Sequence, residues 1–425
     1  MSSPLDDLRR RARAAQQQAQ PAQALALWRE LTAAQPADAE AWDGIGQCCL
    51  QAGDLPQALD ALTRAAEARP TPAAWTLVAL CHQRLADDGG EERALQRALQ
   101  ADASDLMALL MRAKLHERRG QRHDAVRSYG AAATVAPPLE QLPPALRPAV
   151  AYARQFHAAY QQDMAAFLDR FLEPRLAAAG GPAEERFRLA LDILVGRKQR
   201  YDAQPMRFFY PRLAPVEFFP RDTFPWLDAV EAETDAIRDE FLRAQAEDGG
   251  AFVPYITYGE DQPLAQWREL NHSPRWSVLH LVKDGAEVPA NAARCPRTLA
   301  AWRQTPAPVQ SGRTPVCLFS LLKPHTAIPP HVGASNVRLV VHLPLIVPAG
   351  CRFRVGNSVR TWEPGRAWVF DDTIEHEARN DSAQTRVILI FDTWHPGLTA
   401  EERQLISALN EGLEAFGRRD RGYDQ

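Results

Sequence analysis

Two histidines in the last quarter of the chain lie in sequence contexts that suit a metal-binding site. His331 follows two prolines in PPHVG, and His376 follows paired acids in FDDTIEHE. A neutral imidazole is a good ligand for Fe(II), and a non-haem iron site keeps positions open for a co-substrate and O2. The chain has 11 histidines, so the pair alone is weak support, because most such pairs are structural or exposed.

Arg386 begins the run RVILIFD, in which both faces of a strand would otherwise be apolar. A buried arginine needs an anionic partner, and the first acidic residue along this run is Asp392. The planar guanidinium fork holds a carboxylate through two parallel hydrogen bonds. Ser320, in the apolar run VCLFSLL, offers one more hydrogen bond. These residues predict a site for a ligand that carries a carboxylate.

The segment 337–345 predicts a strand with two different faces, because side chains alternate along a strand. Its odd positions are all apolar and predict a core face, whereas its even positions include Arg338 and His342. An arginine and a histidine inside a protein are costly unless they bind something. One face of an antiparallel sheet is often solvated, however. From this strand alone, its polar face can equally be a ligand-binding face or a solvated outer face.

The elements that must position these residues are short strands within residues 206–400. Residues 206–226 are dense in phenylalanine and proline, one helix follows, and apolar runs then alternate with closely spaced turn signals. Short strands at such spacing predict a sandwich or jelly roll. Residues 401–425 predict a C-terminal amphipathic helix with a polar tail.

A repeat of about 34 residues precedes this region, the length typical of tetratricopeptide units. The clearest copy is EAWDGIGQCCLQAGDLPQALDALTRAAEARP, and its markers recur in the neighbouring copies. Small residues such as Gly46 and Ala58 let paired helices approach closely, and Pro70 ends the second helix. The pattern predicts a tetratricopeptide domain over residues 1–140, with an unrelated alanine-rich bundle as the weaker alternative. Residues 141–205 predict a helical cap and connector.

The composition of the chain limits which binding partners and which cellular compartment are expected. The net charge of -4 gives no electrostatic reason to expect nucleic acid or an anionic membrane as a partner. The N-terminus lacks a signal-type apolar segment, and no apolar run is long enough for a membrane span. The cysteines lie scattered in apolar segments without CxxC spacing, which predicts reduced thiols in a cytoplasmic protein: Cys48, Cys49, Cys81, Cys295, Cys317 and Cys351.

Several spaced motifs in the second half of the chain agree in order with one known family. They are FSLLKPHTAIPPHVGASNVRLVVHLPLIVPAGCRFRVG, TWEPGRAWVFDDTIEHEARNDS and RVILIFDTWHP. Dense from Ser320 to Pro396 and looser back to Met206, they resemble the aspartyl/asparaginyl β-hydroxylase family. The resemblance implies a double-stranded β-helix, a jelly-roll or cupin-like fold that uses Fe(II), 2-oxoglutarate and O2. Some members carry tetratricopeptide-like helices ahead of this domain, so a multidomain α + β protein is expected.

The resemblance also implies the iron ligands. His331 and His376 match the family's metal histidines, and Gly333 stands where related oxygenases carry a ligand carboxylate, as in the members that hydroxylate protein side chains. Two acids precede the second histidine. Asp371 and Asp372 are expected either to act on the histidine or an iron-bound water from outside the ligand set, or to cap a turn.

The family's 2-oxoglutarate contacts map onto the strands described above. Ser320 and Arg386 match the residues that hold the far carboxylate, and His342 matches the one near the other end. Animal members of this family have an arginine two residues before that histidine, where this chain has Val340. Arg338 lies on the same strand face as His342 and is expected to replace the missing arginine as a 2-oxoglutarate ligand. The alternative is that Arg338 is a rim residue that faces solvent or substrate. His331, His376 and Arg386 are the residues on which catalysis is expected to depend.

The activity implied is hydroxylation of the β-carbon of an aspartyl or asparaginyl residue in a peptide or protein. The repeats are expected to recruit that substrate in their groove. One alternative is hydroxylation of a small molecule or a lipid acyl chain, and another is halogenation, since a glycine in place of the carboxylate can admit a halide. An alternative of a different class is a non-catalytic tetratricopeptide adaptor with a vestigial β-domain.

Overall fold

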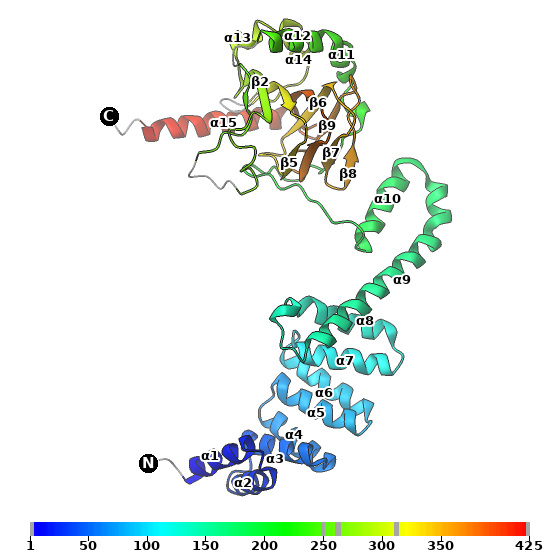
Figure 1. The fold of residues 1–425 in the computed structure, drawn as a ribbon, viewed down its shortest axis with the longest axis vertical. Helices are drawn as coiled ribbons and strands as arrows, with labels where there is room; N and C mark the ends of the chain where they lie inside the picture. Colours follow the sequence, from blue (N-terminus) through cyan, green and yellow to red (C-terminus); the bar gives the residue numbers. More distant parts are fainter. Residues whose placement is uncertain (1–3, 248–250, 260–264, 310–313, 422–425) are drawn as a thin grey trace. The chain divides into compact units, whose positions relative to one another are not determined.

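The computed structural model describes residues 4–247, 251–259, 265–309 and 314–421, with side chains in the last helix up to residue 416. The chain divides by its internal contacts into two compact units, Met1–Gly196 and Arg197–Gln425. The first unit is helical, and the second is built on two sheets (Figure 1).

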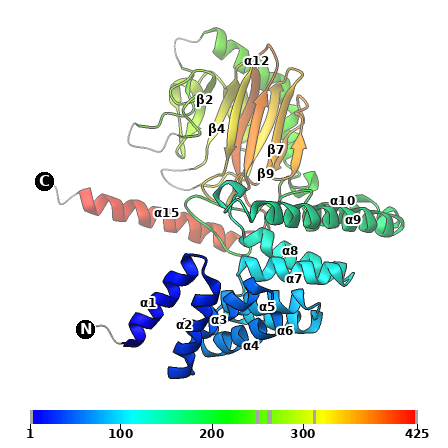
Figure 2. The ribbon, with the colours of Figure 1, turned by 60° about the horizontal axis from the view of Figure 1, so that its bottom comes forward.

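The first unit is a succession of paired helices joined by short turns (Figures 1 and 2). Eight of similar length come first: α1 (Pro4–Gln17), α2 (Pro21–Ala34), α3 (Ala39–Ala52), α4 (Leu55–Ala68), α5 (Pro72–Arg84), α6 (Asp88–Ala101), α7 (Leu106–Arg118) and α8 (Arg122–Val135). After the 3-10 turn Leu139–Gln141 come the long helix α9 (Arg147–Ala179) and α10 (Gly181–Leu194).

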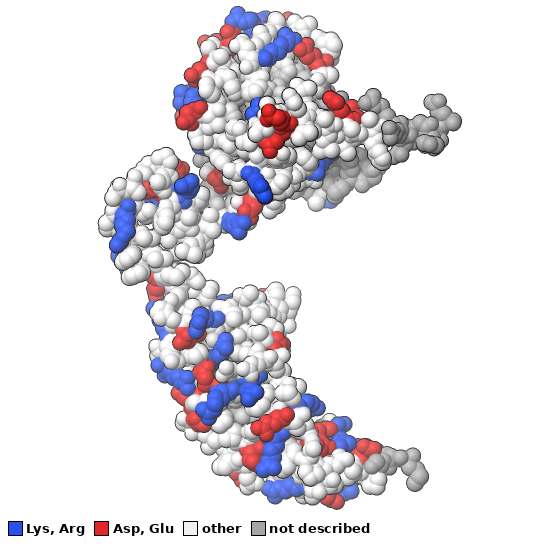
Figure 3. Space-filling model, turned by 180° about the vertical axis from the view of Figure 1, so that it is seen from behind, with Lys and Arg blue, Asp and Glu red and all other residues white. Residues whose placement is uncertain are grey.

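Small residues in this unit lie where neighbouring helices touch. A Cβ on Gly46 would lie 2.4 Å from Leu62 Cγ, and one on Gly44 would lie 2.4 Å from the Trp28 ring. Four helices begin behind an aspartate that accepts a backbone N–H of the first turn: Asp38, Asp54, Asp87 and Asp105. Blue and red side chains are interspersed over the face of this unit seen in Figure 3. The prediction of tetratricopeptide-like helices is confirmed.

The second unit contains a larger antiparallel sheet with the strand order β1-β2-β4-β11-β6-β9, with β3 also paired to β2. The strands are β1 (Val253–Pro254), β2 (Trp276–Lys283), β3 (Ala286–Glu287), β4 (Cys317–Leu322), β6 (Arg338–Ile346), β9 (Trp368–Phe370) and β11 (Arg386–Trp394). Helices cover one face of this sheet: α11 (Leu227–Ala232), α12 (Thr234–Ala246), α13 (Pro289–Ala292) and α14 (Pro296–Trp302).

A smaller antiparallel sheet, in the order β5-β10-β7-β8, faces the other side of the larger one. Its strands are β5 (Thr326–His331), β7 (Cys351–Val355), β8 (Ser358–Arg360) and β10 (His376–Asn380). Both sheets contribute to one buried cluster, for example Leu322 and Ile388 from the larger sheet and Phe353 from the smaller. The last helix, α15 (Ala400–Arg421), follows β11.

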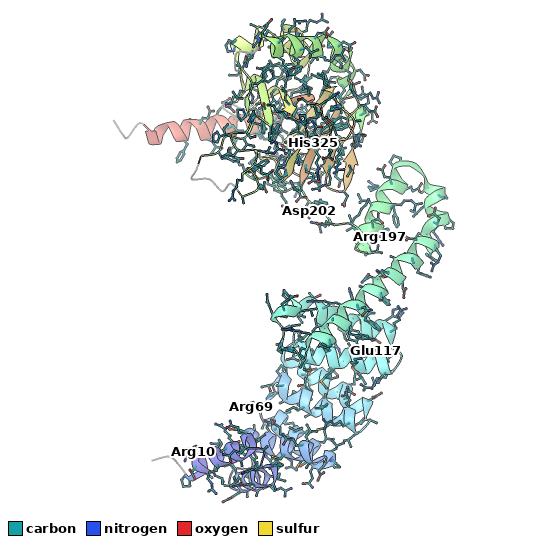
Figure 4. All side chains as sticks on the ribbon, in the orientation of Figure 1. Arg10, Arg69, Glu117, Arg197, Asp202 and His325 are labelled. Atoms are coloured by element: carbon teal, nitrogen blue, oxygen red, sulfur yellow. The ribbon has the colours of Figure 1, made fainter. Side chains whose placement is uncertain are left out.

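The segment that enters the second unit is bound to two of its loops. Arg197 and Asp202 lie along this segment (Figure 4). The backbone N–H of Gln204 donates to the carbonyl of Thr373 at 2.7 Å, and that of Met206 donates to the carbonyl of Gly333 at 3.0 Å. Residues 204–206 therefore tie together the loops that precede β10 and follow β5.

The prediction of an α + β protein, with helical repeats before a strand-rich domain, is confirmed. The described strands form two antiparallel sheets that do not close on one another, so the finer prediction of a double-stranded β-helix stays a prediction. All six cysteines are buried and unpaired. In the described ranges, no helix combines the length and the apolar character that crossing a membrane requires.

Candidate functional site

The two histidines singled out from the sequence lie side by side. His331 ends β5 and His376 begins β10, the two residues are register partners in the smaller sheet, and their ring centroids are 4.1 Å apart. Each Nδ1 lies near a backbone carbonyl oxygen, that of Pro329 at 2.8 Å and that of Ile374 at 3.1 Å. Because a carbonyl only accepts, each Nδ1 carries the proton, and each Nε2 keeps a lone pair for a metal.

Both imidazoles are uncharged near neutral pH. Burial, and then the neighbouring His376, lowers the pKa of His331 to about 3. Burial likewise lowers the pKa of His376 to about 4. Neutral imidazole is the form that binds metal. No group of three or more His, Cys, Asp and Glu side chains able to hold a metal occurs among the described residues.

Asp372 lies against Gly333, the residue where a ligand carboxylate is missing. A Cβ on Gly333 would lie 2.2 Å from Asp372 Cγ, and the backbone N–H of Gly333 donates to the Asp372 carbonyl at 2.6 Å. Asp372 is 6% exposed, and its Oδ1 has no hydrogen-bond partner among the described residues. Asp371 has a different role, because its carboxylate accepts from the N–H and the hydroxyl of Thr373 and so caps the turn.

Arg338 forms a buried ion-pair cluster with two aspartates. Its Nη2 donates to Asp372 Oδ2 and its Nη1 to Asp392 Oδ1, both at 3.0 Å. Asp392 also accepts from the backbone N–H of Val316 at 3.1 Å. Both carboxylate partners of Arg338 thus come from the protein itself, and its expected role as a 2-oxoglutarate ligand in place of Val340 stays a prediction.

Arg386 is buried without a counter-ion among the described residues. It is 1% exposed, and neither Nε nor Nη2 has a hydrogen-bond partner. Its guanidinium carbon lies 5.0 Å from the centroid of the Trp362 ring. Burial lowers the pKa of Arg386 to about 10, which still leaves it charged at neutral pH. A guanidinium in this state is ready to receive a carboxylate.

Two tryptophans orient the polar residues next to Arg386. Trp276 Nε1 donates to Ser320 Oγ at 3.1 Å, which leaves the serine proton available to a ligand. Trp362 Nε1 donates to His342 Nδ1 at 3.3 Å, so the proton of a neutral His342 is on Nε2. Burial holds the pKa of His342 well below its usual value.

The structure therefore brings the sequence-predicted residues to one space between the sheets, as strand alternation predicts. Arg386, Ser320 and His342 occupy inward positions of β11, β4 and β6, and His331 and His376 face them from the smaller sheet. Sequence reasoning singled out neither Trp362 nor Trp276. Trp276 is buried, and no sequence pattern reveals that its indole bonds to a serine 44 residues away.

The fold and site define a helical-repeat protein whose two-sheet domain holds a neutral histidine pair and an unpaired buried arginine. Residues 231–396 match the family described as Aspartyl/Asparaginyl beta-hydroxylase, and residues 9–74 match Tetratricopeptide repeat. The chain thus carries an aspartyl/asparaginyl beta-hydroxylase family domain together with tetratricopeptide repeats, and the resemblance drawn from the sequence is confirmed.

Three curated relatives illustrate the similarity. Aspartyl/asparaginyl beta-hydroxylase of Mus musculus is 33% identical over 182 residues, which are 43% of this chain and 23% of the relative. Aspartate beta-hydroxylase domain-containing protein 2 of Xenopus tropicalis is 28% identical over 211 residues, 48% of this chain and 54% of the relative. Ornithine lipid ester-linked acyl 2-hydroxylase of Rhizobium tropici is 32% identical over 200 residues, 46% of this chain and 66% of the relative. The chain spans from 23% to 66% of the length of these relatives.

Proposed function

We propose that this chain is an Fe(II)- and 2-oxoglutarate-dependent dioxygenase that hydroxylates the β-carbon of an aspartyl or asparaginyl residue in a peptide or protein. The observation that carries the proposal is Arg386, a buried cation whose Nε and Nη2 have no hydrogen-bond partner in the part of the chain that the structure describes. A buried charge normally has a counter-ion. A dicarboxylate co-substrate would provide one, and the family match supports hydroxylation as the chemistry.

His331 and His376 are the proposed iron ligands. Both are neutral, and both keep Nε2 free while Nδ1 is fixed to a backbone carbonyl. Such second contacts hold a ligating imidazole in the right tautomer and orientation. Gly333 supplies no side chain, so positions on the metal stay open, and Asp372 places an unpartnered carboxylate oxygen beside that opening.

Arg386 and Ser320 are proposed to hold the far carboxylate of 2-oxoglutarate, and His342 lies near its other end. Trp276 and Trp362 keep Ser320 and His342 in place through their indole N–H groups. When bound, Fe(II) and 2-oxoglutarate supply the activation of O2: one oxygen atom becomes the hydroxyl at the former C–H bond, the other enters succinate, and CO2 leaves. The apolar side chains between the sheets exclude water from this reaction.

The same proposal covers the finer fold and the role of the repeats. Two facing antiparallel sheets, with the histidine pair on one and Arg386 on the other, are the arrangement expected of a double-stranded β-helix. We assign to the tetratricopeptide helices the recruitment of a polypeptide substrate, since solenoids of this type offer extended concave surfaces.

A second candidate is hydroxylation of a lipid acyl chain, favoured by the similarity to the Rhizobium relative that is named for this activity. The two candidates share the cofactor site and differ in the substrate. Products formed from peptides and from ornithine-containing lipids, compared under the same conditions, distinguish them.

The experiment that tests the proposal measures succinate formed from 2-oxoglutarate by the full chain with and without added Fe(II), and 2-oxoglutarate binding by calorimetry without O2. We expect iron-dependent succinate in the wild type and none in His331→Ala or His376→Ala. A matched control is His325→Asn, an exposed histidine with a positive φ of 51° that asparagine tolerates. Wild type that neither binds 2-oxoglutarate nor forms succinate contradicts the proposal and favours a non-catalytic adaptor.

A further inference from the structure

The end of the inter-sheet space beside the histidine pair holds more carboxylates than cations. Asp371, Asp372 and Asp392 are all at most 6% exposed there. Arg338 is the cation among them, and it bonds to both Asp372 and Asp392 at 3.0 Å. Burial raises the pKa of Asp371 to about 6 and also raises that of Asp392. Three carboxylates nevertheless share one guanidinium, and that guanidinium is already occupied on both sides, so it does not attract another anion.

The neighbouring inward positions add no positive charge. Leu318, Ile390 and Val340 face the same space from β4, β11 and β6. His280 lies beside Leu318 in β2 and is uncharged near neutral pH, because burial lowers its pKa to about 4. Besides Arg338, the described inward strand faces carry one more arginine, Arg386. It is the residue proposed to hold the co-substrate.

The side wall next to the histidines is aromatic. The Trp267 ring meets His331 edge-on at 5.1 Å and is stacked with Trp276, with the ring centroids 6.2 Å apart and the planes inclined by 30°. Tyr255 stacks on Trp276 at 4.2 Å and is 45% exposed, so this wall reaches solvent. Aromatic faces are electron-rich and offer a neutral side chain an apolar contact, but they repel an anion.

One buried acceptor in the cluster lacks a donor. Within the described ranges Asp372 Oδ1 has no hydrogen-bond partner, although the residue is only 6% exposed. A substrate amide carries two N–H donors, whereas a carboxylate carries none. An amide brought to this end would satisfy the free oxygen, and a carboxylate would face it with like charge.

We propose that the side chain hydroxylated by this protein is the amide of an asparaginyl residue rather than the carboxylate of an aspartyl residue. The inference rests on the proposed function and narrows its substrate class. Like charges a few ångströms apart in a partly buried site repel strongly enough that we expect a preference of about tenfold or more for asparagine.

The test uses the full chain with Fe(II), 2-oxoglutarate and O2 on a complex peptide digest, and mass spectrometry counts added oxygen on asparagine and aspartate. A modified peptide is then synthesised in both forms. We expect kcat/KM to favour the asparagine form about tenfold or more, and calorimetry without O2 to give the same order of preference in Kd.

Asp392→Asn tests the cause of the preference. It removes one of the two carboxylates on Arg338 and keeps an oxygen for the Val316 N–H, so the preference for asparagine should shrink severalfold. The control is Asp381→Asn, the same change at a half-exposed aspartate that pairs with Arg352 and Arg379, which should leave the preference unchanged.

Each outcome decides. Succinate formation with aspartate modified as efficiently as asparagine overturns the inference and leaves the proposed function standing. Succinate formation with no modified peptide at all overturns both the inference and the proposed peptide substrate, and favours the lipid candidate. A preference that Asp392→Asn does not reduce overturns its assignment to this cluster. Absence of iron-dependent succinate contradicts the proposed function itself, and the inference falls with it.

Discussion

The carboxylate of Asp372 occupies the space that a side chain at Gly333 would need, since a Cβ there would lie 2.2 Å from Asp372 Cγ. The glycine and the aspartate therefore require each other, although Gly333 follows the first histidine, His331, and Asp372 precedes the second, His376, on strands that are distant in sequence. Asp372 is in turn bonded to Arg338, so a change at Gly333 reaches the ion-pair cluster.

Gly333→Ala should destabilise the sheet unit by about 1–3 kcal/mol, because the added methyl group overlaps a buried carboxylate held by an ion pair. Thermal unfolding followed by calorimetry measures the change. The control is Gly412→Ala in α15, where a Cβ would meet nothing within 4 Å and alanine should add up to about 1 kcal/mol of helix stability. A neutral Gly333→Ala would mean that Asp372 moves aside freely.

The histidine pair should make the metal-free protein sensitive to mild acid. Both histidines have folded-state pKa values near 3 and 4, below the ordinary 6.5. The unfolded chain thus takes up their protons first, and the stability they contribute, present above about pH 6.5, is lost as the pH falls toward 4. Relative to His331→Gln/His376→Gln, wild type should lose unfolding free energy between pH 7 and 5. Parallel curves for the two proteins would contradict the depressed pKa values.

Arg386→Met should separate stability from co-substrate binding. Removal of a buried, unpartnered charge should raise the unfolding free energy of the ligand-free protein by about 1 kcal/mol or more. The same change should weaken 2-oxoglutarate binding by about ten- to a hundredfold or more. Arg386→Lys should restore binding only in part, because a point charge cannot reproduce the fork. Calorimetry of both properties, with Arg352→Met at a half-exposed outward position as the control, tests the pair of effects.

Arg338→Ala should destabilise the sheet unit by about 3–5 kcal/mol, because it leaves Asp372 and Asp392 buried without a cation. Arg338→Ala/Asp392→Asn should recover part of this loss. Measured together with 2-oxoglutarate affinity, the variants also decide the role expected from the sequence. If the Kd for 2-oxoglutarate is unchanged in the double variant, Arg338 does not replace the arginine that stands in the family at the position of Val340.

Removal of the repeats should affect substrate use without affecting the cofactor site. A chain that begins at Arg197 keeps every proposed ligand and the Gln204 and Met206 backbone bonds, so it should bind 2-oxoglutarate normally and lose activity on a macromolecular substrate. A chain that begins at Pro211 also lacks those bonds and should bind Fe(II) more weakly. Full activity of the first form on the natural substrate would show that the repeats are not a recognition device.

The repeats and the site residues were accessible to sequence reasoning because their signals are local. The sequence signal of a helix pair lies within about 34 residues, and the alternation of side chains within β6 places Arg338 and His342 on one face. The contacts between strands were not accessible in this way. Arg338 meets Asp372 and Asp392 at separations of 34 and 54 residues. These pairings follow from strand order and register, which a single strand does not encode.

The short segment that enters the sheet unit has a further consequence. Its Gln204 and Met206 N–H groups are shared between the loop before His376 and the loop after His331. Neither loop can swing out while these two bonds persist, so the loops form one cooperative opening unit. The two imidazoles come from strands that are distant in sequence, yet the loops beside them open or stay closed together.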